Sequence, residues 1–359
     1  MGDRMNSKER VLAAVRRERP DRPATSLRCT PEAWTSLKKH LGVETNGDVL
    51  DALDIDLRWV GVPFIGPKER SAIPLGSEGT DFWGCHIRKV ENEFNTYFEF
   101  DRHPLADARS VQDVARHDWP SVDWWDYRAL PAAIQAANRK EPRAIMYFAG
   151  GAFETPWYIR GLEAFLVDLY ENPDIVDGIC SRVMEYYLQR AARVIDAAKG
   201  QIDMIGSGGD IGSQRGMMVN PDLWRERIKP YSGKLISTFK KQGLATFYHS
   251  CGSMAPVIDD LIDVGLDVLD PIQVGAAGMK PEELFPVFGD RLSFHGAIDE
   301  VELLPHSTPK QVYEETTRII DILGEKGGFI VSPSHAVQGD TPPENIVAIY
   351  DAVRDYRWS

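Results

Sequence analysis

The stretch Thr246-Phe247-Tyr248-His249-Ser250-Cys251-Gly252 carries a buried strand into a polar turn. Residues 244–248 are apolar, aromatic or β-branched, which is typical of a buried strand. Side chains two apart on an extended segment point the same way, so the imidazole of His249 and the thiol of Cys251 are predicted to converge. Such a pair suits zinc. One histidine and one cysteine by themselves are weak evidence for a metal site, because buried cysteine often serves only as a small hydrophobe.

Strand and helix patterns alternate on both sides of this stretch. Eight β-rich runs are each followed by a helical pattern, which predicts a single α/β domain over residues 1–359 built as a (β/α)8 TIM barrel. An open doubly wound sheet is the alternative, but no Gly-x-Gly-x-x-Gly loop follows the first strand. The predicted strands are Ala24–Arg28, Leu57–Val60, Ala144–Phe148, Ile202–Ser207, Leu244–His249, Asp267–Pro271, Leu292–Gly296 and Gly328–Ser332.

Two segments lie outside this repeat. A helix is predicted over Ser7–Glu18, with Ser7 as its cap, packing on the barrel without a catalytic role. Residues 62–142 lack strand–helix alternation and are interpreted as an insertion that covers the barrel mouth, with a β-hairpin within 87–100. The predicted barrel helices lie within 30–37, 49–53, 161–199 (two helices), 221–242, 253–264, 281–288, 309–324 and 343–354.

Composition excludes several classes of protein. The chain has 359 residues, 43% of them hydrophobic, which supplies a full core and argues against disorder. A net charge of −13 argues against sequence-independent binding to nucleic acid. The longest apolar runs fall short of the roughly 18 residues of a membrane helix. Four widely spaced cysteines and a charged N-terminal segment lead us to expect a cytoplasmic protein.

The carboxyl ends of the predicted strands are polar, and in TIM barrels these ends carry the chemistry. The catalytic candidates are Glu154, Asp210 and His295. The structural alternatives stay open, since Asp210 could instead cap a helix and His295 could be a core histidine. The substrate-binding candidates are Trp83, Phe153, Trp157, Gln214, Gln273 and Asp299, of which the aromatic residues could equally be core or lid residues and Asp299 a helix cap.

His335, on the loop after the eighth strand, is the candidate third metal ligand. In a closed barrel, strands five and eight can both direct side chains at the axis. Three protein ligands with an open fourth position are the arrangement of catalytic zinc. A shared zinc requires the ring of His335 to lie within about 5 Å of the sulfur of Cys251.

Several motifs resemble the uroporphyrinogen decarboxylase superfamily over nearly the whole chain. They are Lys8-Glu9-Arg10-Val11 with Arg19-Pro20-Asp21-Arg22, His249-Ser250-Cys251-Gly252 with Asp259-Asp260-Leu261-Ile262, His295-Gly296-Ala297-Ile298-Asp299, and Thr341-Pro342-Pro343-Glu344-Asn345. The resemblance implies a (β/α)8 barrel. It implies one of two activities, because the family holds metal-free decarboxylases and zinc methyltransferases that work with corrinoid proteins.

Two departures favour the methyltransferase branch. The decarboxylases carry an arginine-rich loop after the first strand, whereas the loop here, Leu27-Arg28-Cys29-Thr30-Pro31, has one arginine. The methyltransferases carry His-x-Cys and a later cysteine as zinc ligands. Here His249 and Cys251 match, and His335 stands in place of the second cysteine. Zinc held by two neutral histidines and one thiolate keeps a positive charge and is the stronger Lewis acid.

The resulting hypothesis is a zinc-dependent methyltransferase that moves a methyl group from a small, methoxylated substrate to a corrinoid, either free or on a partner protein. One alternative is a metal-free decarboxylase of a smaller carboxylated substrate, in which Asp210 or Asp299 steadies a protonated intermediate. Another is a barrel that binds a metal or a corrinoid partner without turnover. A homodimer is also open, because the sequence does not fix the oligomeric state.

Overall fold

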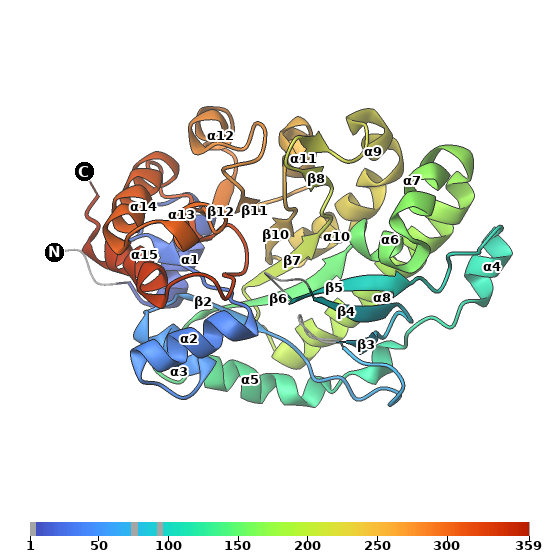
Figure 1. Cartoon of the computed structure of the whole chain (residues 1–359), viewed down its shortest axis with the longest axis horizontal. Coiled ribbons are helices and arrows are strands. Elements are labelled where there is room, and N and C mark those ends of the chain that lie inside the picture. Colours follow the sequence, from blue (N-terminus) through green and yellow to red (C-terminus); the bar gives the residue numbers. More distant parts are fainter. Residues whose placement is uncertain (1–4, 73–77, 92–95, 359) are drawn as a thin grey trace.

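A computed structural model describes residues 5–72, 78–91 and 96–358. Its main sheet is the predicted eight-stranded parallel barrel, with neighbours in the order β1-β13-β12-β11-β10-β7-β6-β2 (Figure 1). The first strand is shorter than predicted, and β6 and β12 run further. The strands are β1 Ala24–Thr25, β2 Leu57–Val60, β6 Ala144–Gly151, β7 Met204–Gly208, β10 Ala245–His249, β11 Val268–Ile272, β12 Ser293–Ile298 and β13 Phe329–Pro333.

Helices surround the sheet (Figure 1). Within the described residues, none is both long enough and apolar enough to span a membrane. They are α2 Pro31–Leu41, α3 Asn46–Ala52, α5 Leu130–Ala137, α6 Glu154–Arg160, α7 Leu162–Glu171, α8 Pro173–Ala198, α9 Pro221–Arg227, α10 Lys229–Lys241, α11 Ile258–Asp263, α12 Pro281–Phe288, α13 Leu303–His306, α14 Pro309–Leu323 and α15 Pro343–Asp355.

Two predicted helices are interrupted in the structure. The 221–242 helix divides into α9 and α10 at Ile228. Pro230 stands in the first turn of α10, where its missing N–H prevents α9 from continuing. The 253–264 helix reduces to a 3-10 turn, Ala255–Val257, followed by the short α11. The sequence pattern predicted helices in both segments but not their breaks.

The N-terminal helix α1, Ser7–Val15, closes the bottom of the barrel. Its cap is Asn6 rather than Ser7, because the Asn6 side chain accepts a hydrogen bond from the Glu9 amide at 3.0 Å. The helix ends before Glu18, and Arg17 turns the chain with a φ of +60°. Val11 and Ala14 belong to the same apolar cluster as inward side chains of the strands. The expected packing of this helix on the barrel is therefore confirmed.

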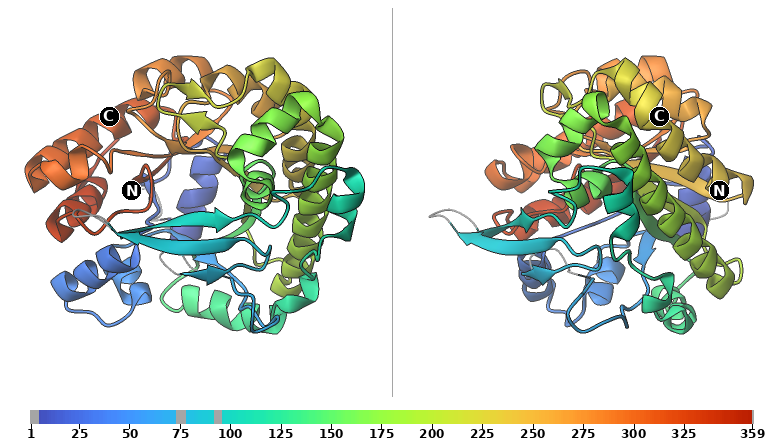
Figure 2. Two further views of the ribbon diagram at one scale, coloured as in Figure 1. Left: turned by 45° about the vertical axis from the view of Figure 1, so that its right-hand side comes forward. Right: turned by 90° about the vertical axis from the view of Figure 1, so that its right-hand side faces the viewer.

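The predicted hairpin lies within residues 62–142. β4, His86–Glu91, and β5, Thr96–Arg102, pair antiparallel, with β3, Gly79–Thr80, on the outer side of β4. This small sheet projects from one side of the barrel (Figure 2). Phe100 of β5 stacks on Tyr158 of α6 with ring centroids 4.3 Å apart, which anchors the hairpin near the carboxyl end of β6. The segment also contains α4, Val111–Arg116, whereas α5 packs on β2 and α8 and belongs to the outer helical layer.

A buried carboxylate joins the first and second strands of the barrel. The Asp56 amide donates to the Thr25 carbonyl at 3.2 Å, between β1 and β2. The Asp56 carboxylate is fully buried and accepts hydrogen bonds from the Thr25 amide at 3.0 Å, from Arg22 at 2.8 Å and from Arg10 at 3.1 Å. Arg10 and Arg22, one from each N-terminal motif, are therefore structural, because they neutralise the carboxylate that closes the barrel.

Replacing Asp56 with Asn should lower the free energy of unfolding by about 3–5 kcal/mol, because the change leaves buried guanidinium groups without their carboxylate. Denaturant unfolding of the purified variant measures this loss. Arg16→Ala is the control, since Arg16 is exposed and pairs with exposed Glu18, and it should change stability by about 0.5 kcal/mol or less. Equal stability of the two variants would show that the barrel closes without this network.

Candidate metal centre

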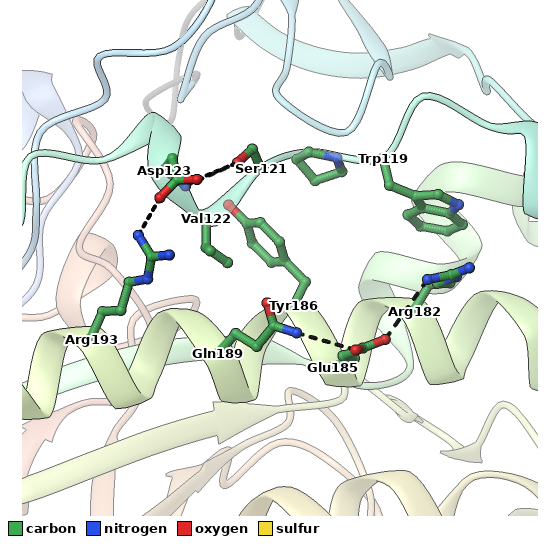
Figure 3. A pocket seen from close by; sticks show the side chains of 10 residues that line it. Trp119, Ser121, Val122, Asp123, Arg182, Glu185, Tyr186, Gln189 and Arg193 are labelled. Atoms are coloured by element: carbon green, nitrogen blue, oxygen red, sulfur yellow. Dashed lines mark hydrogen bonds and ion pairs between the residues drawn. The ribbon is translucent and has the colours of Figure 1, made fainter.

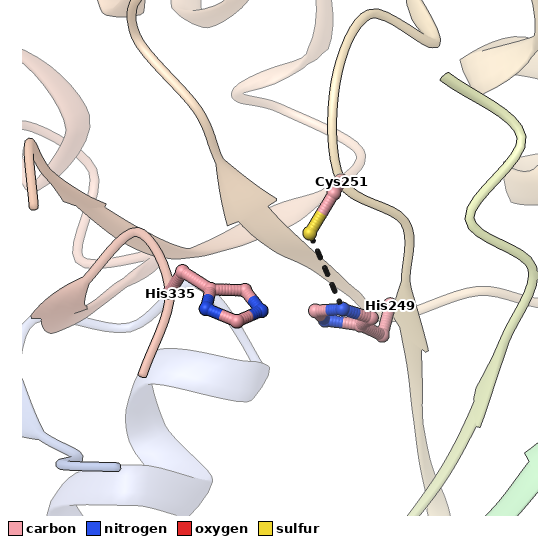
Figure 4. A group of neighbouring side chains, drawn as sticks. All are labelled: His249, Cys251 and His335. Atoms are coloured by element: carbon pink, nitrogen blue, oxygen red, sulfur yellow. Dashed lines mark hydrogen bonds between the residues drawn. The ribbon is translucent and has the colours of Figure 1, made fainter. Parts of the chain in front are cut away.

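Three side chains from the carboxyl end of the barrel face one point (Figure 4). His249 ends β10, Cys251 lies in the following loop, and His335 lies in the loop after β13. One donor atom from each lies within 4.8 Å of the other two. The Cys251 sulfur is 3.6 Å from Nε2 of His249. The group meets the distance limit that a shared metal ion sets, and it joins residues more than eighty positions apart in the chain.

The protonation states of these side chains fit a soft or borderline metal ion. Burial, together with His249 and Arg28, lowers the pKa of His335, so its ring is neutral and offers a lone pair. Burial, and then the carboxylates of Asp210 and Asp270, raise the pKa of the Cys251 thiol. A bound dication would replace the thiol proton and satisfy the surrounding negative charge. Two imidazoles and one thiolate are a donor set typical of zinc.

Asp270, which was not among the predicted site residues, supports the centre. It lies in β11 directly beside His249 of β10 and is fully buried. Its carboxylate accepts hydrogen bonds from Nδ1 of His249 at 2.5 Å and from Arg28 at 3.2 Å. Burial alone would raise the pKa of Asp270, but Arg28, His295 and His249 together hold it well below its usual value. Its position one strand from His249 was the available sequence signal.

Two acidic side chains lie beside the donor group. The carboxyl group of Glu154, at the start of α6, shares a hydrogen bond with Asp210. Burial, followed by the charge of Asp210, raises the pKa of Glu154 well above its usual value, so it holds a proton at neutral pH. Asp210 lies 3.5 Å from Nε2 of His249 and accepts a hydrogen bond from the Cys251 amide at 2.9 Å. The structure thus brings both predicted acids to the donor group.

Backbone conformation at Asp210 and Gly151 helps to place the two acidic side chains. Asp210 adopts a φ of +43°, an unfavourable value for a non-glycine residue and a form of strain that clusters at functional sites. A Cβ atom on Gly151 would come within 2.4 Å of the Glu154 carboxyl group, so only glycine leaves room for it. The second carboxyl oxygen of Glu154 is buried without a hydrogen-bond partner among the described residues. It is therefore available to a bound molecule.

The aromatic candidates lie in different surroundings. Phe153 is fully buried and packs on Phe165, with ring centroids 5.6 Å apart. Trp157 packs on Tyr158 at 4.2 Å, near the acidic pair. Trp83 packs on Tyr186 at 4.8 Å, in an apolar cluster that joins the insertion to α8. Their predicted contacts with substrate remain predictions.

Tyr158 is a neighbour of Glu154 that the sequence analysis did not name. Burial, and then the charges of Glu154 and Asp210, raise the pKa of its hydroxyl group. It stands four residues after Glu154 on α6, so the two side chains share one helix face. That spacing was the signal in the sequence.

The remaining predicted polar residues do not all converge. Gln273 accepts a hydrogen bond from the Gly252 amide at 2.7 Å and so holds the loop that carries Cys251. Gln214 is exposed in the turn between β8, Gly212–Ser213, and β9, Gly216–Met217. Asp299 accepts hydrogen bonds from the Val301 and Glu302 amides and lines a separate cavity of about 320 Å³ beside α14. The Asp299 carboxylate is thus engaged by its own loop, as the alternative of a helix cap implied, and its predicted contact with substrate stays a prediction.

A further cavity of about 370 Å³ lies between α8 and residues 119–123 of the insertion (Figure 3). Arg193 pairs with Asp123 across it, and Tyr186 forms part of its wall. Its lining includes none of the predicted site residues.

Comparison with known proteins identifies the family of this chain. The model of the family described as Uroporphyrinogen decarboxylase (URO-D) matches residues 96–356. The chain therefore belongs to the uroporphyrinogen decarboxylase family and is an enzyme of that family, as its motifs indicated. A uroporphyrinogen decarboxylase from Coxiella burnetii is 21% identical over 270 residues, which cover 71% of this chain and 69% of that protein.

Methyltransferases match over a longer span. The methylcobamide:CoM methyltransferase MtbA of Methanosarcina acetivorans is 19% identical over 370 aligned residues, which cover 98% of both proteins. The solved structure of a methyltransferase from Methanosarcina mazei superposes with a TM-score of 0.71 at 17% identity, covering 98% of this chain and 99% of that one. This superposition confirms the barrel fold.

The metal centre predicts a matched pair of cysteine variants. Cys251→Ser should lose most bound zinc while the barrel stays folded, because a core of this size does not need a metal to hold it. Cys29→Ser should keep its zinc, since Cys29 is also partly buried but lies outside the donor group. Elemental analysis with circular dichroism tests both points. Equal zinc content in the two variants would exclude Cys251 as a ligand.

Zinc affinity should rise with pH. The raised pKa of Cys251 keeps its thiol protonated in the metal-free protein, so binding releases one proton, whereas the His335 ring is already neutral. The apparent affinity should therefore increase about tenfold per pH unit between about pH 7 and 8. Chelator competition at several pH values measures the slope. A flat profile would contradict thiolate coordination.

Proposed function

We propose that the chain is a zinc-dependent methyltransferase that transfers a methyl group from a small methoxylated substrate to a reduced corrinoid, either free or on a partner protein. The observation that carries the proposal is the His249–Cys251–His335 donor group beside the Glu154 carboxyl group, whose pKa burial and Asp210 raise well above its usual value. Support comes from the match over 98% of both chains to a protein named as a methylcobamide:CoM methyltransferase.

His249, Cys251 and His335 are the residues that would hold the zinc. The metal, when bound, supplies a Lewis acid that polarises the oxygen bearing the methyl group. Two neutral imidazoles and one thiolate would offset only one of the two positive charges of zinc. The remaining positive charge favours polarising an oxygen leaving group over activating a bound thiol as a nucleophile. Gln273 fixes the Cys251 loop through the Gly252 amide, so the donor group is preorganised.

Glu154 is the proposed proton donor. The bond between the methyl carbon and the substrate oxygen breaks, the methyl group passes to the reduced corrinoid, and the oxygen keeps the electron pair. That oxygen then accepts the proton from the Glu154 carboxyl group, whose raised pKa keeps it protonated at neutral pH. Asp210 receives the hydrogen bond of the acid before transfer and positions it.

Decarboxylation is the second candidate, because the family model and one group of relatives are named for it. The surroundings of Arg28 argue against this activity. Its guanidinium bonds to Asp270 at 3.2 Å and lies over the Trp59 ring at 4.9 Å. The one arginine of the first strand–helix loop is thus committed to the support of the centre rather than free to bind substrate carboxylates.

A paired assay distinguishes the two activities. Zinc-loaded protein is mixed with reduced cobalamin and a panel of methoxylated compounds, and methylcobalamin formation is followed by its absorption spectrum. Carbon dioxide release is measured from a panel of carboxylated compounds. Methyl transfer that depends on zinc supports the proposal, whereas carbon dioxide release without zinc or methyl transfer overturns it.

Glu154→Gln should lower the rate of methyl transfer by about 10²–10⁴-fold at unchanged zinc content, because the amide cannot supply the proton. Glu163→Gln, on the exposed face of α7, is the matched control and should keep the wild-type rate. A Glu154→Gln variant as active as this control would exclude Glu154 as the acid.

A further inference from the structure

We propose that Asp270 and His295 form a positioning pair that fixes the ring of His249, with its proton on Nδ1 and its Nε2 lone pair turned to the metal. The inference rests on the metal site of the proposed function. It makes His295 a positioning residue that acts on the metal ligand through Asp270, whereas the sequence analysis listed His295 as a catalytic candidate.

The pair is built from three neighbouring strands. Asp270 of β11 lies between His249 of β10 and His295 of β12. One carboxylate oxygen accepts the hydrogen bond from Nδ1 of His249 and the other accepts the hydrogen bond from Nδ1 of His295, both at 2.5 Å. The pairing of β11 with β12 is irregular between Leu269 and Ile272, where Pro271 has no N–H to donate. This irregularity lies beside the carboxylate that both rings share.

Burial fixes the hydrogen bonding of His295. Its side chain is fully buried, and its Nε2 atom has no hydrogen-bond partner among the described residues. The Phe247 ring lies edge-on to it at 5.2 Å. A proton on Nε2 would leave a buried N–H group unsatisfied, at a cost of about 1–3 kcal/mol. Nδ1, the ring atom that faces Asp270, is therefore the donor to that carboxylate.

The contacts of His249 lead to the same tautomer. The Asp270 carboxylate accepts a hydrogen bond from Nδ1 of His249 at 2.5 Å and pairs with Arg28 at 3.2 Å. With the proton of His249 on Nδ1, its Nε2 atom keeps a lone pair and points toward the sulfur of Cys251, 3.6 Å away. A carboxylate behind a ligating histidine fixes ring orientation and increases ligand basicity. His295 in turn fixes the carboxylate.

Four variants test the contacts among His249, Asp270 and His295. Their zinc affinity is measured by competition with a chromophoric chelator. Asp270→Asn should bind zinc about 10–100-fold more weakly, in the range typical for loss of such a support. His295→Leu should also weaken binding, and His295→Asn should restore most of it, because its amide nitrogen can replace Nδ1 as a donor. Asp267→Asn is the control, since Asp267 bonds the Thr246 amide and Lys240 near the start of β11.

The tautomers give a second readout that needs no metal. In the full chain stripped of metal and labelled with ¹⁵N-histidine, His249 and His295 should both show a protonated Nδ1 and an unprotonated Nε2. Signals are assigned with the single variants. A wild-type chain that binds no zinc but shows these tautomers would overturn the proposed function and leave the pair intact. Nε2-protonated rings, or equal zinc affinity of Asp270→Asn and Asp267→Asn, would overturn the pair.

Discussion

Closure of the parallel sheet at Asp56 is the constraint on which the centre depends. The donor residues lie on β10 and after β13, with β11 and β12 between them. Their side chains meet only when the sheet curves fully, which requires β1 to join β2. Strand β1 is the shortest of the barrel sheet and has two residues, so backbone pairing alone supplies little there. The buried carboxylate and its arginines provide the missing contacts, and they link the N-terminal motifs to the geometry of the mouth.

Electrostatics then divides the mouth into two parts. On one side, Arg28 and Asp270 form a balanced pair behind the ligating histidine. On the other, Glu154 and Asp210 share a proton in a space that includes a buried, unpartnered oxygen. The thiol of Cys251 lies between the two parts. Burial and the neighbouring carboxylates disfavour its thiolate form unless a cation is bound. In the proposed function, the first part would hold the metal and the second would supply the proton for the same bond cleavage.

The sequence predicted the barrel because strand and helix periods are local properties. His249 and Cys251 followed from the alternation of side chains along one strand, and His335 followed from the closure of a barrel. Asp270 and Tyr158 were missed because their importance comes from neighbours on other elements: a carboxylate at a strand end looks like a cap until the adjacent strand is in place. The same limit explains Asp299, which resembled a site residue in sequence but bonds to its own loop.

X-ray absorption at the zinc edge of the purified, zinc-loaded protein tests the central claim most directly. The account predicts one zinc per chain with two nitrogen ligands at about 2.0–2.1 Å, one sulfur ligand at about 2.3 Å, and a further light-atom ligand from solvent or substrate. A spectrum without sulfur, with two sulfur ligands, or with no stoichiometric zinc would contradict a centre built from His249, Cys251 and His335.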